Sequence, residues 1–61
     1  MMTVRERLDE IRAMIKQSAW AYADIQANEL YEYSTMHRLS EDEFTELFCY
    51  LDVISRHTKT T

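Results

Sequence analysis

Leu39-Ser40-Glu41-Asp42-Glu43-Phe44 is the stretch that decides the fold of this chain. The Ser40 hydroxyl can accept from the backbone N–H of Glu43, and the Glu43 carboxylate can accept from the N–H of Ser40, which makes a capping box. Leu39 and Phe44 have the spacing of a hydrophobic staple, and the three acidic residues suit the positive end of a helix dipole. These signals agree that a helix begins directly after Ser40, so the chain divides here into two arms.

The arm after the cap has the spacing of an amphipathic helix. Apolar residues recur every three or four positions, which predicts a helix over about 41–57. The members of this stripe are Phe44, Leu47, Phe48, Leu51 and Ile54. Cys49 and Val53 project from the opposite side of the same helix. The tail 58–61 has no apolar residue, and we expect it to be disordered.

The arm before the cap begins with the same signal. Thr3 and Glu6 have capping-box spacing, which predicts that a first helix starts at Val4. One stripe then keeps its phase for about eight helical turns and favours a single helix over about 4–36, followed by a turn at 37–40. Its members are Val4, Leu8, Ile11, Ile15, Ala19, Tyr22, Gln26, Leu30 and Tyr33. The alternative is a break near Gln17-Ser18, which the absence of Gly and Pro disfavours.

The centre of this long helix is apolar beyond its main stripe. A second side carries Ala13, Trp20, Ala27 and Tyr31, and a third carries Met14, Ala21 and Ile25. A helix that is apolar on several sides is buried by more than one neighbour. We therefore expect the middle of the chain to be covered by more than one other helix.

The two arms differ in length, and this difference predicts a dimer. A helix over 4–36 is about 50 Å long and one over 41–57 about 25 Å, so an antiparallel hairpin leaves the first half of the long helix uncovered. A second copy of the chain would cover it, giving a dimeric helical bundle. The expected partner or dimer interface consists of Leu8, Ile11, Ile15, Trp20, Tyr31, Cys49 and Val53.

Composition supports one small all-α domain. The 61 residues include no Gly and no Pro, so turns that need positive φ are few. The single cysteine excludes an internal disulfide and suits a reducing compartment, from which we expect a cytoplasmic protein. No apolar run reaches the roughly 18 residues of a membrane span.

The sequence predicts no catalytic, cofactor or metal site. His37, Cys49 and His57 are too far apart along the chain to converge easily, and no H-x-x-x-H or C-x-x-C spacing occurs. The acidic residues after Ser40 fit helix capping, because a calcium loop would need alternating oxygen ligands and a turn glycine. We therefore expect a non-enzymatic protein without a cofactor.

Charge shapes the expected function. The chain carries a net charge of −4, with eight carboxylates against Arg38 alone between residues 17 and 54. This distribution repels nucleic acid, so the favoured function is a protein–protein interaction module, such as an adaptor, inhibitor or regulatory subunit of a larger protein. The alternative is linked to nucleic acid, either as a DNA-binding regulator using its basic N-terminal arm or as an acidic DNA mimic.

The capping box gives the first testable prediction. Replacing Ser40 by Ala removes the side-chain acceptor at the start of the second helix, so the free energy of unfolding should fall by about 0.5–2 kcal/mol. Denaturant titration measures this loss. Hydrogen exchange of residues 41–54 in the unmodified protein provides the check, because amides there that exchange as fast as the tail would contradict the helix itself.

Overall fold

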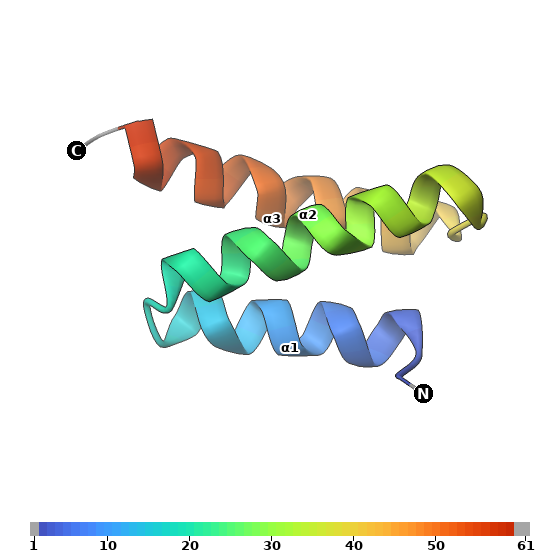
Figure 1. Ribbon diagram of the computed structural model, residues 1–61, viewed down its shortest axis with the longest axis horizontal. Helices are drawn as coiled ribbons and strands as arrows, with labels where there is room; N and C mark the ends of the chain where they lie inside the picture. Colours follow the sequence, from blue (N-terminus) through green and yellow to red (C-terminus); the bar gives the residue numbers. More distant parts are fainter. Residues whose placement is uncertain (1, 60–61) are drawn as a thin grey trace.

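Three α-helices make up residues 2–59, which are the residues that the computed structural model describes. They are α1 (Val4–Lys16), α2 (Trp20–Met36) and α3 (Glu41–Lys59). α1 and α3 run in the same direction and α2 runs back between their ends, so the two chain ends lie far apart along the molecule (Figure 1). The prediction of an all-α protein is confirmed, whereas the two-helix hairpin is wrong.

Both capping boxes form as their spacing predicts. At α3, the Ser40 N–H donates to Glu43 at 3.0 Å and the Glu43 N–H donates to the Ser40 hydroxyl at 3.2 Å. At α1, the Thr3 N–H donates to the Glu6 carboxylate and the Glu6 N–H donates to the Thr3 hydroxyl, both at 3.1 Å. The predicted helix starts at Val4 and Glu41 are therefore confirmed.

The single helix over 4–36 is wrong, because the chain reverses at residues 17–19. Ser18 adopts a left-handed conformation with φ 60°. The Ala19 N–H donates to the carbonyl of Met14 at 2.8 Å, and the Ser18 N–H donates to that of Ile15 at 3.0 Å. This pair of bonds is a Schellman motif, which normally places Gly where Ser18 stands.

The reversal is stabilised by the core that it creates. A left-handed non-glycine residue costs about 1–2 kcal/mol, whereas burying one large aliphatic side chain contributes about 1.5–3 kcal/mol. Once α1 folds back, Leu8 is 0% exposed and Ile11 is 1% exposed within a single chain. The uncovered arm that motivated the dimer does not exist, and the longest dimension of the molecule is 34 Å. The structural reason for expecting a dimer is thus removed.

All three helices contribute to one core, and alanines bring them close together. Ala23, Ala27 and Leu30 of α2 are fully buried between α1 and α3. Small side chains at this position let neighbouring helix axes approach closely. The complete set of buried apolar residues is Leu8, Ile11, Ala23, Ala27, Leu30, Leu39, Leu47 and Ile54. Phe44, the other member of the predicted staple with Leu39, packs against this core.

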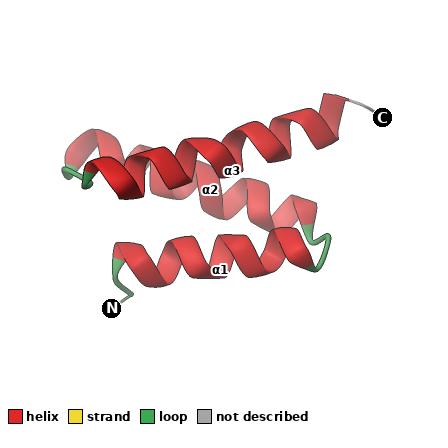
Figure 2. Ribbon diagram, turned by 180° about the vertical axis from the view of Figure 1, so that it is seen from behind, coloured by secondary structure: helices red, strands yellow, loops and turns green. Residues whose placement is uncertain are grey.

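The end of α3 differs from the expected disordered tail. Thr58 and Lys59 are helical, while residues 60–61 lie outside the described residues. Near this end the His57 ring stacks on Trp20 of α2, with 3.9 Å between ring centroids and 12° between the planes. Seen from behind, α3 and α1 lie in front of α2, so both pack against the same side of it (Figure 2). The stack of His57 on Trp20 joins the last turns of α3 to the start of α2.

The left-handed serine gives a prediction. Ser18→Gly should raise the free energy of unfolding by about 1 kcal/mol, because glycine adopts positive φ without the steric cost of a Cβ atom. Thermal and urea unfolding measure the change. Gln17→Gly is the matched control, since Gln17 has φ −91° and glycine there should only destabilise. Equal destabilisation by both substitutions would contradict the strain at Ser18.

Candidate interaction surface

The seven residues expected at an interface are divided by the structure between core and surface. Leu8 and Ile11 are buried, and Ile15 and Trp20 pack against the core as partly buried residues. These four residues contribute to the core of a single chain, and their place at an interface stays a prediction. Tyr31, Cys49 and Val53 are exposed, as an interface requires.

The three exposed residues do not form one surface. The Tyr31 ring meets the edge of Phe48 on α3, with 6.1 Å between centroids, and Phe48 in turn meets Phe44 at 4.7 Å. Cys49 and Val53 come one and five residues after Phe48, so helical geometry turns them to a different side of α3. Tyr31 therefore belongs to the junction of α2 and α3, away from the other two.

The most extensive apolar exposure lies on α2, on the side away from the core. Tyr22, Ile25 and Met36 are 68%, 53% and 82% exposed. With Glu29 and Glu32 they are spaced three, four, three and four residues apart, so all five share one side of the helix. We call this set, Tyr22, Ile25, Glu29, Glu32 and Met36, the outer stripe of α2. Single exposed apolar residues are normal, but three aligned on one helix form a candidate interaction surface.

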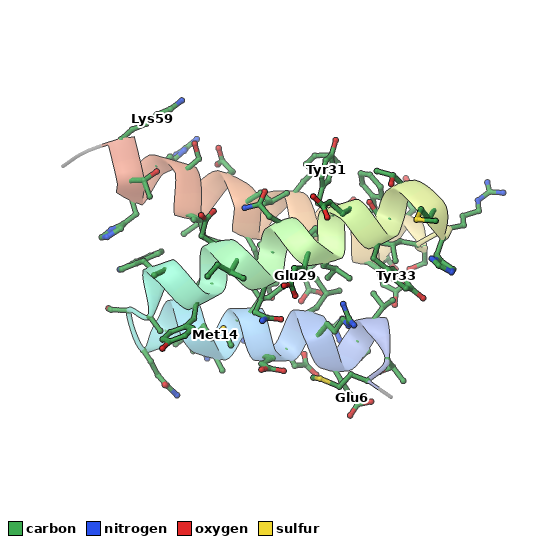
Figure 3. All side chains as sticks on the ribbon, viewed as in Figure 1. Glu6, Met14, Glu29, Tyr31, Tyr33 and Lys59 are labelled. Carbon is green, nitrogen blue, oxygen red and sulfur yellow. The ribbon has the colours of Figure 1, made fainter. Side chains whose placement is uncertain are left out.

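Two tyrosines border the outer stripe. Tyr31 projects along the edge of α2 beside α3, and Tyr33 projects from the opposite edge toward α1 (Figure 3). Tyr33 stacks on His37 with 4.3 Å between centroids, and the Arg7 guanidinium lies 5.6 Å from the centroid of its ring. Both tyrosines keep more than a third of their surface exposed, so each adds exposed aromatic surface to one flank of α2.

The outer stripe is acidic and has no cation of its own. α2 carries Asp24, Glu29 and Glu32 and contains no Lys or Arg. None of these carboxylates is in an ion pair with another residue in the range 2–59. In contrast, the ion pairs of α1 and α3 join Arg5 to Asp9 and Glu46, and Arg56 to Asp52. Uncompensated negative charge therefore accompanies the exposed apolar residues.

Sequence reasoning missed the outer stripe because it carried one helical phase across the reversal. That phase placed Tyr22 with the core residues, whereas Ala23 and Ala27 take the inward positions of α2. The available signal was the apolar third side containing Ile25, which indicated a second neighbour. Within residues 2–59 no other part of the chain covers that side of α2, because α1 and α3 both pack on the opposite side.

A polar network joins α1 to α3 at the far side of the molecule from this surface. Arg5 donates to the Glu46 carboxylate at 2.5 Å and to Asp9 at 3.1 Å, and the Tyr50 hydroxyl donates to Glu46 at 2.6 Å. Hydrogen bonds from Arg5 and then Tyr50 hold the pKa of Glu46 below its usual range. Burial, followed by the bond to Glu46, raises the pKa of Tyr50 to about 12.

The histidines and the cysteine show no convergence on a reactive centre. His37 and His57 each stack on an aromatic ring and lie near opposite ends of α3, and Cys49 is exposed between them along the chain. No group of three metal-ligating side chains occurs in residues 2–59, and no helix in that range is long and apolar enough to cross a membrane. A shallow depression on α1, lined by Asp9, Arg12, Ala13 and Lys16, contains no aromatic residue and only one carboxylate.

The Glu46 network predicts two separate pH responses. Because the pKa of folded Glu46 lies below its ordinary value of 4.5, its stabilisation is present above about pH 4.5 and is lost as the pH falls through the folded value. Tyr50 has a raised pKa, so its contribution is present below about pH 10 and is lost as the pH rises toward 12. Glu46→Gln should lower the free energy of unfolding at neutral pH. It should also reduce the loss of that free energy when the pH falls.

Tyrosine absorbance gives the corresponding control. One tyrosine should ionise with a pKa of about 12, and Tyr50→Phe should remove that step while leaving the folded far-ultraviolet circular dichroism spectrum. An unchanged alkaline titration in the Tyr50→Phe variant would contradict the network.

Comparison with known proteins gives no significant match to this chain. No protein-family model matches the chain, and neither a curated protein nor a solved structure shows significant similarity to it. The functional interpretation therefore rests on the geometry and charge of the outer stripe of α2.

Proposed function

We propose that this protein is a non-enzymatic protein–protein interaction module whose larger partner packs on the outer stripe of α2. The observation that carries the proposal is that α2 is packed on one side only, although its opposite side presents Tyr22, Ile25 and Met36. Large apolar side chains aligned on one exposed helical face are typical of surfaces that bind another protein. Tyr31 and Tyr33 add the aromatic residues that dominate the binding energy of many interfaces.

Contacts made by the arginines of α1 weigh against the alternative of a basic DNA-binding arm. Arg5 is held by Asp9 and Glu46, and Arg7 lies over the Tyr33 ring. Each engaged guanidinium would have to give up a protein contact before neutralising a phosphate. A different feature weighs against the alternative of an acidic DNA mimic. The outer stripe has apolar residues on both sides of its two carboxylates, whereas a groove that binds phosphates favours anions along its whole length.

A pair of matched double variants tests the proposed surface. Tyr22→Ser/Ile25→Ser removes two apolar residues of the outer stripe, and Cys49→Ser/Val53→Ser removes two exposed residues of α3 that the sequence nominated. Immobilised protein is exposed to soluble extract of the source organism, and retained proteins are quantified by mass spectrometry. The first variant should lose about tenfold or more of the specific partner, the loss expected for a hot-spot residue, while the second keeps it.

The outcome that contradicts the proposal is equally specific. Retention lost only in the Cys49→Ser/Val53→Ser variant would move the interface to α3. A partner released by duplex DNA from the unmodified protein would favour the mimic. Circular dichroism verifies that both variants are folded, which is expected because substitutions of exposed residues usually change stability by less than about 0.5 kcal/mol.

A further inference from the structure

We infer that the partner segment bound by the outer stripe of α2 is a basic amphipathic helix. This inference rests on the proposed function and specifies the chemistry of the partner at that same surface. Three features of the stripe support it: its unpaired carboxylates, its apolar ends and its helical geometry.

The charge of the stripe indicates a cationic partner. Glu29 and Glu32 lie between Ile25 and Met36, and neither is in an ion pair within residues 2–59. Arg7 lies over the Tyr33 ring and Arg38 lies in the loop after α2, and neither forms an ion pair with Glu29 or Glu32. Lys or Arg residues of a partner, at the level of Glu29 and Glu32, would supply the missing counter-charges and speed association.

The fold indicates that this partner segment is helical. Residues 2–59 form three helices without a strand, so this part of the chain offers no sheet edge to which an extended peptide could add. A partner must then satisfy its own backbone hydrogen bonds, which a helix does. α2 has 17 residues, about 25 Å, so a helix of about 18 residues would follow the stripe from Tyr22 to Met36.

A second copy of this chain fits the stripe less well. In a two-fold dimer formed by this surface, the stripe would meet its own image. Glu29 and Glu32 of one protomer would then approach the same residues of the other, and like charges across an interface are unfavourable. The apolar ends favour burial against another surface, but the acidic centre favours a surface of opposite charge.

Two labelled peptides test the inference directly. Both are amphipathic helices of about 18 residues with the same leucine stripe, and they carry Lys in one case and Glu in the other on the flanking positions. Fluorescence anisotropy with the full chain measures binding. The Lys peptide should bind at least about tenfold more tightly than the Glu peptide, and added salt should weaken it. Equal binding of the two peptides, or no binding of the Lys peptide, overturns the inference.

Two charge variants separate local recognition from net charge. Glu29→Gln/Glu32→Gln removes the carboxylates of the stripe, whereas Glu10→Gln/Asp42→Asn removes two exposed carboxylates on α1 and α3 and changes the net charge equally. The stripe variant should bind the Lys peptide roughly fivefold to tenfold more weakly, as expected for two exposed ion pairs, and the control should bind nearly as the unmodified protein does. The same loss in both variants would show non-specific attraction and overturn the inference.

The failure of this inference is distinguishable from failure of the proposed function. If Tyr22→Ser/Ile25→Ser abolishes partner retention while the Lys and Glu peptides bind alike, the surface is functional and its partner is not a basic helix. Sedimentation equilibrium tests whether a second copy of the chain occupies the stripe instead. A species of twice 7.4 kDa that reverts to a monomer in the Tyr22→Ser/Ile25→Ser variant would assign the stripe to self-association and overturn the inference.

Discussion

The reversal of the chain at Ser18 is the constraint on which the rest of the structure depends. A serine at φ 60° and two Schellman hydrogen bonds end α1 and send the chain back along it. The local cost of the left-handed residue, about 1–2 kcal/mol, is smaller than the gain from burying Leu8 and Ile11, at about 1.5–3 kcal/mol each. Without this turn the first helix would have no neighbour within the chain.

The same reversal determines which side of α2 is left uncovered. Because α1 and α3 both pack on the side that carries Ala23, Ala27 and Leu30, the opposite side has no partner within residues 2–59. Polar residues would be sufficient for a solvent-exposed helical side, yet Tyr22, Ile25 and Met36 occupy it. The location of the proposed binding surface is thus a consequence of how the core is built.

Charge is arranged differently on the two sides of the molecule. The carboxylate of Glu46 accepts hydrogen bonds from Arg5 and Tyr50, which joins α1 to α3 and lowers the pKa of that carboxyl. The carboxylates of Glu29 and Glu32 on α2 have no such partners in the described chain. Acidic residues therefore serve the fold at the junction of α1 and α3, while on α2 they remain available to another molecule.

The sequence by itself determined the helical class and the starts of α1 and α3. Both capping boxes could be predicted because they depend only on residues three positions apart, Thr3 with Glu6 and Ser40 with Glu43. The end of the first arm near Met36 was also predictable, since the capped helix that follows leaves only a short connection. The sequence also showed that the middle segment is rich in aromatic residues, and it predicted that more than one neighbour packs against this segment.

Only the tertiary structure decided where the first arm reverses and which residues form the proposed binding surface. The turn has neither Gly nor Pro, and the left-handed conformation of Ser18 is unfavourable until α1 has packed on α2 and α3. A short turn also resets the helical phase, so Tyr22 moved from the expected core to the surface and alanines took its place inside. Helical periodicity relates residues within one helix, whereas the side that a helix buries is chosen by the contacts it makes with its neighbours.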